Sequence, residues 1–242
     1  MLSLLRGELY RLLRKRSTYI YFGALAVTYA LLIYIRSGGF DARSVISDAT
    51  SFFYLLPALA GGFLFSAIYT DDLNSKNLIS LVGYGMSKTK IVFVKLVLMV
   101  LLSAIVFTLV TLLHGALFTL LGWTLTTSNW TMLFSISLKY FLMTVGFAAL
   151  SGIAVYGLQR NTFAMVFYIV LSFNVVGGIL TVALNMFAPD LTQYLLSGIT
   201  DRIMLAIVEG GSVITPTIAY LFYLGVALVA SVWAFHRTEM EF

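Results

Sequence analysis

This chain has few charged residues and no cysteine. Charged residues make up 10% of the 242 positions and hydrophobic residues 60%, whereas soluble domains carry roughly 25% charged residues. Too few polar side chains exist to cover a globular surface in water, which argues against a soluble enzyme. Cysteine is absent, which excludes disulfides and cysteine metal sites.

Sequence motifs of catalytic, metal-binding and nucleotide-binding sites are missing as well. The chain has two histidines, His114 and His236, and no His-Glu-x-x-His motif, so neither a catalytic residue nor a metal site is predicted. Residues 83–89 read Gly-Tyr-Gly-Met-Ser-Lys-Thr and lack the Gly-Lys of a phosphate-binding loop, so no nucleotide cofactor is expected in this chain. The net charge of +5 is not gathered in a compact basic domain, which argues against a nucleic-acid partner.

Long charge-free runs predict an all-α polytopic membrane protein with a single transmembrane domain over residues 1–242. A crossing needs about 20 apolar residues. The run 96–138 is too long for one crossing and breaks at residues 122–130, a polar stretch with a tryptophan at each end, typical of the membrane interface. Six transmembrane helices are predicted, at residues 17–35, 49–70, 96–121, from 133–139 to 159, 162–187 and 213–235. A re-entrant hairpin in place of two crossings is the alternative around the fourth.

Basic residues predict the orientation. Six crossings place both termini on one side, and lysine and arginine concentrate there, at Arg6, Arg11, Arg14, Lys15, Arg16, Lys76, Lys88, Lys90, Lys95, Arg160 and Arg237. The other side holds Arg36, Arg43, Lys139 and Arg202. This asymmetry favours cytoplasmic termini. The expected location is the plasma membrane of a bacterium. The first run is long enough to span, so it is interpreted as an uncleaved crossing rather than a signal peptide.

Residues 1–16 have the pattern of an amphipathic helix. The apolar stripe consists of Leu2, Leu5, Leu9, Leu12 and Leu13, and the opposite face of Glu8, Arg11, Arg14 and Lys15. Such a helix lies in the membrane interface and contacts anionic lipid headgroups. The membrane-interface residues predicted from it are Arg6, Arg11, Arg14 and Lys15. The alternative is a basic flank that only sets the topology.

Residues 71–90 predict a short cytoplasmic helix between two crossings. An acidic pair, Asp71 and Asp72, ends the second crossing. Leu78, Leu81 and Val82 then recur at helical spacing before glycines 83 and 85. Ser87 is placed to cap the helix that leads into the third crossing. Such a helix suits docking of a soluble partner, and an ordinary polar loop is the alternative.

This segment resembles the loop between the second and third crossings of type-2 ABC exporter permeases, the ABC-2 family. In that family an acidic residue, a coupling helix, a small residue, a serine and a basic residue precede a lysine of the third crossing. The residues that match in order are Asp72, Leu78, Leu81, Gly85, Ser87, Lys88 and Lys95. Lys76-Asn77 stands where many members have Gly-Thr. The resemblance implies an ATPase-coupling site made of Asp71, Asp72, Lys76, Asn77, Leu78, Leu81, Gly85, Ser87 and Lys88.

The resemblance also implies partners and a role. It implies a dimer with a second permease chain, the same or different, and two copies of a cytoplasmic ABC ATPase that binds ATP and magnesium. The cargo path is expected between the first, second and fifth crossings. An apolar, aromatic-rich interior suits a drug, an amphipathic peptide or a lipid-like molecule. The alternative function is an ATP-independent carrier or channel, which the lack of acidic residues in mid-membrane disfavours.

Two further features carry weaker predictions. Residues 188–212 form an extracytoplasmic segment with apolar residues at helical spacing, interpreted as an amphipathic or re-entrant helix, or as a loop helix lying on the membrane. His114, inside the third crossing, is expected to make a polar contact between helices rather than to relay protons.

Overall fold

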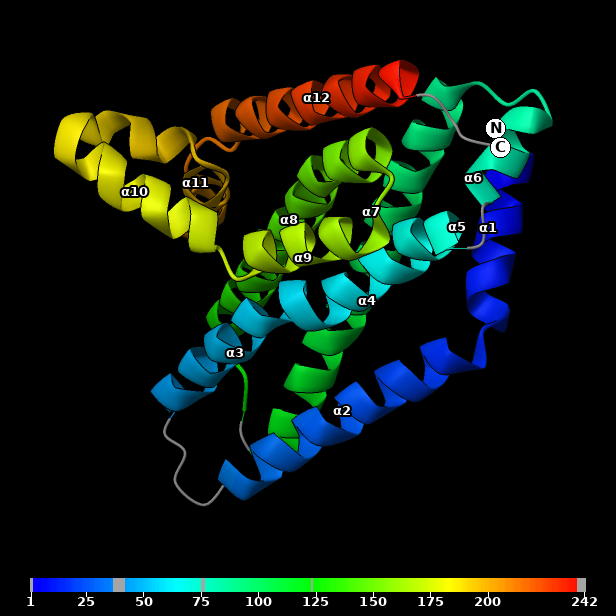
Figure 1. The fold of residues 1–242 in the computed structure, drawn as a ribbon. Coiled ribbons are helices and arrows are strands. Elements are labelled where there is room, and N and C mark those ends of the chain that lie inside the picture. The colour runs from blue at the N-terminus through cyan, green and yellow to red at the C-terminus, as the bar shows by residue number, and fades with distance from the viewer. Residues whose placement is uncertain (1, 37–41, 75–76, 123, 239–242) are drawn as a thin grey trace.

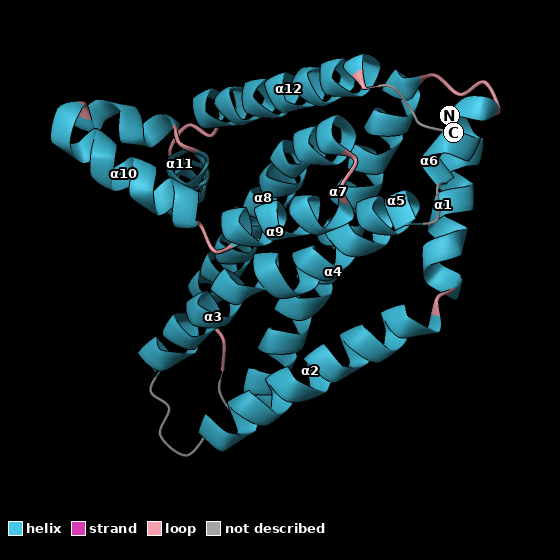
Figure 2. Ribbon diagram, viewed as in Figure 1, coloured by secondary structure: helices cyan, strands magenta, loops and turns pink. Residues whose placement is uncertain are grey.

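The fold is known from a computed structural model, which describes residues 2–36, 42–74, 77–122 and 124–238. Helices account for most of these residues, short loops join them, and none of the described residues lies in a strand (Figure 2). The predicted all-α fold is therefore confirmed.

The elements follow one another in the order shown in Figure 1. The first half of the chain contains α1 (Leu2–Arg14), α2 (Arg16–Arg36), α3 (Ala42–Leu56), the π-helical turn η2 (Pro57–Gly61), α4 (Gly62–Phe65), a second π-helical turn η3 (Ser66–Thr70), α5 (Asp71–Asn74), α6 (Asn77–Gly83) and α7 (Lys88–Leu120). The second half contains α8 (Thr127–Leu158), α9 (Asn161–Ser172), α10 (Val175–Phe187), the 3₁₀ helix η4 (Pro189–Tyr194), α11 (Leu196–Glu209) and α12 (Ile214–Arg237).

Four helices in the described residues are long and apolar enough to cross a bilayer: Ala49–Leu73, Lys88–Leu120, Thr127–Leu158 and Ile214–Arg237. The bent pair α9 and α10 makes a fifth if both belong to one crossing. Helix α2 is 21 residues long and matches the predicted first crossing, but it is not among these candidates. The structure thus supports four or five crossings, and the sixth stays a prediction.

The predicted start of the fourth crossing was wrong. Helix α8 begins at Thr127, where the Thr126 side chain accepts a hydrogen bond from the Asn129 backbone N–H at 3.3 Å. This threonine cap starts the helix inside the stretch taken for a loop. Helices α7 and α8 have 33 and 32 residues, so each exceeds the length of one crossing, which favours two crossings over a re-entrant hairpin.

The predicted fifth crossing was wrong as a continuous helix. It breaks between α9 and α10, which meet at an angle of 52°. Asn174 adopts a left-handed conformation at the break, with φ of 53°, which asparagine tolerates better than most residues. No residue of α10 is buried, and α10 projects from the bundle at the left of Figure 1.

The second crossing is continuous but contains two π-helical turns. Pro57 opens the first of them, because proline cannot complete the regular α-helical hydrogen bonds. Tyr168 of α9 donates a hydrogen bond to the Pro57 carbonyl oxygen at 2.9 Å. Gly61 makes this approach possible, since a Cβ there would lie 2.3 Å from the Tyr168 hydroxyl oxygen. The second crossing and α9 are therefore joined at one close contact.

Helix α11 of the segment 188–212 packs on α8. Leu196, Ile199 and Ile203 on one face of α11 are buried. Asp201 of the same helix pairs with Lys139 of α8 at 2.5 Å. His114 of α7 is buried against Tyr29 of α2, whose hydroxyl lies at its Nδ1 atom, which confirms the predicted polar contact between helices.

Candidate functional site

A buried cluster of four charges lies where α1, α5 and α7 meet. The cluster consists of Glu8, Arg11, Asp72 and Lys95 and is called the four-charge network below. Arg11 donates from Nη1 to Oδ1 of Asp72 at 2.7 Å and from Nη2 to Oε2 of Glu8 at 2.8 Å. Lys95 pairs with the same Glu8 oxygen at 2.9 Å and also with Asp72. Two cations and two anions thus alternate around the cluster.

Burial makes the network an unusual feature. The side chains of Lys95 and Asp72 are 1% exposed, and that of Arg11 is 34% exposed. Burying an isolated charge at such depth costs several kcal/mol of desolvation free energy. Removing one partner of a buried ion pair lowers stability by roughly 3–5 kcal/mol, because the other charge is left buried. The balance of two positive and two negative charges offsets that cost.

Each element contributes its charge for a local reason. Glu8 and Arg11 are three residues apart and lie on one face of α1. Asp72 follows the second π-helical turn at the end of the second crossing. Lys95 lies seven residues after Lys88, the first residue of α7, and so about two turns inside that helix.

The predicted placement of α1 needs a correction at Glu8. The sequence assigned Glu8 to a polar face turned away from the protein, but its side chain is buried in the network. Leu5, Leu9 and Leu12 pack against the bundle core. Arg6 and Arg14 are exposed, so α1 presents only part of its basic face to the surroundings, and its contact with the membrane interface stays a prediction.

Two further contacts surround the network. Lys15 pairs with Asp71, which joins the α1–α2 connection to the start of α5. Lys88 donates hydrogen bonds from Nζ to the carbonyl oxygens of Phe235 at 2.7 Å and Thr238 at 3.1 Å. A cation is favourable at the carbonyl end of a helix, so Lys88 fastens the start of α7 to the end of α12.

The predicted short helix exists as α6. Leu78 is buried, and Leu81 and Val82 pack against the core, so its apolar side faces the bundle. The helix ends in a Schellman motif, in which the Gly85 N–H bonds the Val82 oxygen at 2.9 Å and the Met86 N–H bonds the Leu81 oxygen at 3.1 Å. Gly85 has φ of +81°, a conformation that glycine adopts without strain.

The outer side of this turn is accessible. Tyr84 is 86% exposed, and Gly85 and Ser87 are exposed beside it. Ser87 occupies the cap position of α7, although its side chain makes no capping hydrogen bond. Lys76 and the Asn77 side chain lie outside the described residues. The surface of residues 84–87 is called the coupling turn below.

The predicted coupling residues therefore fall into two groups. The first group, which holds the segment on the bundle, consists of Asp71, Asp72, Leu78, Leu81 and Lys88. Gly85 and Ser87 lie on the accessible coupling turn. Glu8 and Lys95 belong to the site but were missed as site residues. The signal for Lys95 was a lysine two turns inside an apolar helix, which calls for an anionic partner.

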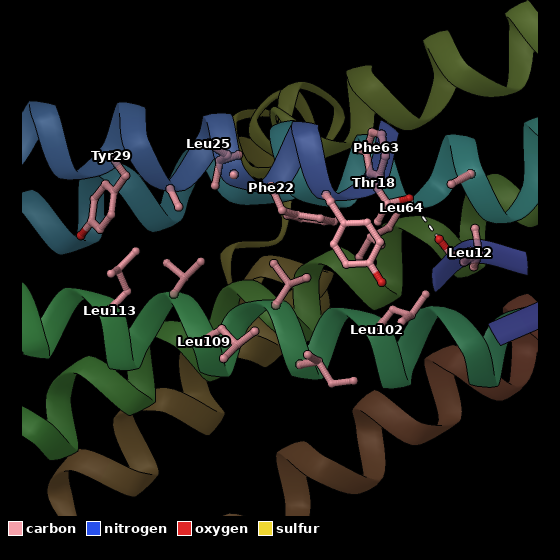
Figure 3. A pocket seen from close by; sticks show the side chains of 17 residues that line it. Leu12, Thr18, Phe22, Leu25, Tyr29, Phe63, Leu64, Leu102, Leu109 and Leu113 are labelled. Atoms are coloured by element: carbon pink, nitrogen blue, oxygen red, sulfur yellow. Dashed lines mark hydrogen bonds between the residues drawn. The ribbon is translucent and has the colours of Figure 1, made fainter. Parts of the chain in front are cut away.

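An apolar cavity of about 430 Å³ opens between α2 and α7 (Figure 3). Side chains from α4 and the end of α1 complete its wall, with Phe63, Leu64 and Leu12 among them. None of the described residues that line it carries a charge. A cavity of this size is within the range of small-molecule sites.

The apolar crossings define a polytopic membrane protein. Residues 4–180 match the family profile of ABC-2 family transporter proteins, and the chain therefore belongs to the ABC-2 transporter permease family, as its sequence resemblance predicted. Comparison with curated proteins gives no match. Membership of this family implies a membrane-bound transport subunit that works with an ABC ATPase.

Proposed function

We propose that this chain is the permease subunit of an ATP-driven exporter that moves a drug, an amphipathic peptide or a lipid-like molecule. It crosses a bacterial plasma membrane six times with both termini in the cytoplasm. It works as a dimer with a second permease chain, the same or different, and two cytoplasmic ABC ATPase subunits. These partners bind ATP and magnesium, and this chain transmits their movement to the crossings.

The four-charge network is the observation that carries this proposal. It links α1, the end of the second crossing and the start of the third at the same end of the bundle as α6 and the end of α12 (Figure 1). Force applied to the coupling turn reaches α7 directly, because α7 begins at Lys88, just after the turn. It reaches α1 and the second crossing through Lys95, Glu8 and Asp72.

Rigid transmission is what a coupling site requires. Packed interfaces move as units between discrete arrangements rather than deforming continuously. Leu78 in the core and Lys88 on the Phe235 carbonyl fix both ends of the segment that contains the coupling turn. A docked ATPase that shifts this turn would therefore move several crossings together.

The test is co-purification of the tagged chain from its native membrane, with mass spectrometry of the associated proteins. Tyr84→Arg changes an exposed side chain on the coupling turn without touching the network. Tyr194→Arg is the matched control, since Tyr194 is 58% exposed in η4, on the segment predicted to be extracytoplasmic.

We expect a stoichiometric ABC ATPase with the unaltered chain and with Tyr194→Arg, and loss of the ATPase with Tyr84→Arg at an unchanged yield of permease. Absence of any ATPase in several mild detergents would contradict the exporter proposal and favour an ATP-independent carrier. Equal ATPase recovery from both variants would instead contradict the assignment of the coupling turn.

A further inference from the structure

The cavity between α2 and α7 has the length of one membrane leaflet. On α7 its lining residues run from Leu102 to Leu113, and on α2 from Thr18 to Tyr29. Each stretch rises by roughly 16 Å at 1.5 Å per residue, close to half of a hydrocarbon core of about 30 Å. Thr18 and Leu102 lie at one end of the cavity, and Tyr29 and Leu113 lie at the other (Figure 3).

The α1–α2 connection lies at the first of these ends. The Thr18 N–H donates to the Lys15 carbonyl oxygen at 3.0 Å, and the Thr18 hydroxyl donates to the Leu12 carbonyl oxygen at 3.2 Å. The connection therefore turns tightly where the cavity begins, which places Arg14, Lys15 and Arg16 at its mouth.

The mouth carries an excess of positive charge. Lys15 is neutralised by Asp71. Arg14 and Arg16 are exposed, and the structure gives no ion pair between either of them and a described carboxylate. Arg14 donates a hydrogen bond to the Tyr10 hydroxyl oxygen at 3.0 Å, which is not an ion pair. Basic groups at this depth attract anionic lipid headgroups.

We propose that this cavity binds one acyl chain of an anionic phospholipid, whose headgroup lies against Arg14 and Arg16. The apolar wall, the depth of one leaflet and the cationic mouth all match such a lipid. The proposal requires that α2 lies in the bilayer. If the termini are cytoplasmic, as proposed above, the lipid belongs to the cytoplasmic leaflet. Only this choice of leaflet rests on the proposed function. The bound lipid would contact α1, α2, α4 and α7 together, next to the four-charge network.

Two substitutions separate chain binding from headgroup binding. Gly23 lines the cavity, and a Cβ added there meets no atom within 4 Å, so Gly23→Leu fills the space without a backbone clash. Gly225→Leu is the matched control, because its Cβ also meets open space but the residue lies on α12, away from the cavity. The double variant Arg14→Gln/Arg16→Gln removes the charges and keeps the cavity.

The experiment is native mass spectrometry of the delipidated full-length chain, titrated with dioleoyl phosphatidylglycerol or with dioleoyl phosphatidylcholine. The unaltered chain and Gly225→Leu should bind one phosphatidylglycerol more tightly than all later lipids. Gly23→Leu should lose this first site. The arginine double variant should bind phosphatidylglycerol about 25-fold more weakly, about fivefold for each charge lost, with phosphatidylcholine binding unchanged.

Three results would overturn the proposal. One is equal phosphatidylglycerol binding by Gly23→Leu and Gly225→Leu, and another is no preference for phosphatidylglycerol over phosphatidylcholine in the unaltered chain. The third is loss of a dimer in Gly23→Leu at constant lipid count, which would assign the cavity to a second copy of this chain. If Gly23→Leu lowers the Tm, Ala26→Phe on the same wall replaces it. These readouts do not involve the ATPase, so they succeed or fail independently of the exporter proposal.

Discussion

Replacing Lys95 by methionine tests whether the four-charge network holds α1 on the bundle. The change keeps an unbranched side chain of similar length but removes the buried ammonium group. It leaves Glu8 and Asp72, both buried, with the guanidinium of Arg11 as the one cation of the network. Removing one partner of a buried ion pair costs about 3–5 kcal/mol. Because Arg11 is partly exposed and can reorient, we expect a loss of about 3 kcal/mol, at the lower end of that range.

The matched control is Lys139→Met. Lys139 pairs with Asp201, and these side chains are 19% and 43% exposed, so loss of this pair should cost about 1 kcal/mol or less. Equilibrium unfolding of the purified chain in mixed detergent and dodecyl sulfate measures both free energies. The double variant Lys95→Met/Glu8→Gln restores the charge balance and should recover more than half of the loss. Equal costs for Lys95→Met and Lys139→Met, or no recovery in the double variant, would refute the reasoning.

Three smaller changes are measured by the Tm of the purified chain. Gly61→Ala should lower the free energy of unfolding by about 1–3 kcal/mol, as overpacking does, because the added Cβ would lie 2.3 Å from the Tyr168 hydroxyl oxygen. Gly62→Ala is the control and should leave the Tm unchanged, because its Cβ would meet no atom closer than 3.8 Å. Gly85→Ala should cost about 1 kcal/mol because φ is +81° there, and an unchanged Tm would show that the turn adopts another conformation. Tyr156→Phe should not lower the Tm, since its buried hydroxyl has no hydrogen-bond partner among the described residues; a clear loss would show that the hydroxyl belongs to the network.

Much of the fold could be predicted from the long charge-free runs and from the residues that end helices. The long apolar runs gave the bounds of the crossings to within a few residues at the second and the last, because lipid excludes charge and backbone must be satisfied within the helix. The errors in the helix bounds arose where a single polar residue begins or breaks a helix. The Thr126 side chain caps α8 earlier than expected, and Asn174 adopts the left-handed conformation that breaks the fifth predicted crossing.

The site was harder to predict than the fold. A helical wheel shows that Glu8 and Arg11 share a polar face, but it does not show whether that face meets water or other charges. Asp72 and Lys95 lie 64 and 87 positions after Glu8 in the sequence. Only the three-dimensional packing of α1 brings these side chains together. The family resemblance placed Asp72 in the coupling region and matched Lys95 to a lysine of the third crossing, but it gave neither residue a contact with α1.

Cross-linking from the coupling turn tests most directly whether this surface meets an ATPase. The chain contains no cysteine, so Tyr84→Cys creates one thiol, which can be labelled with a photoreactive maleimide in native membranes. Tyr194→Cys provides the same exposed thiol on the segment predicted to be extracytoplasmic. We predict that light joins the chain to an ABC ATPase, identified by mass spectrometry, from position 84 and not from position 194. Failure to capture an ATPase from position 84, or equal capture from both positions, would contradict the assignment of the coupling turn.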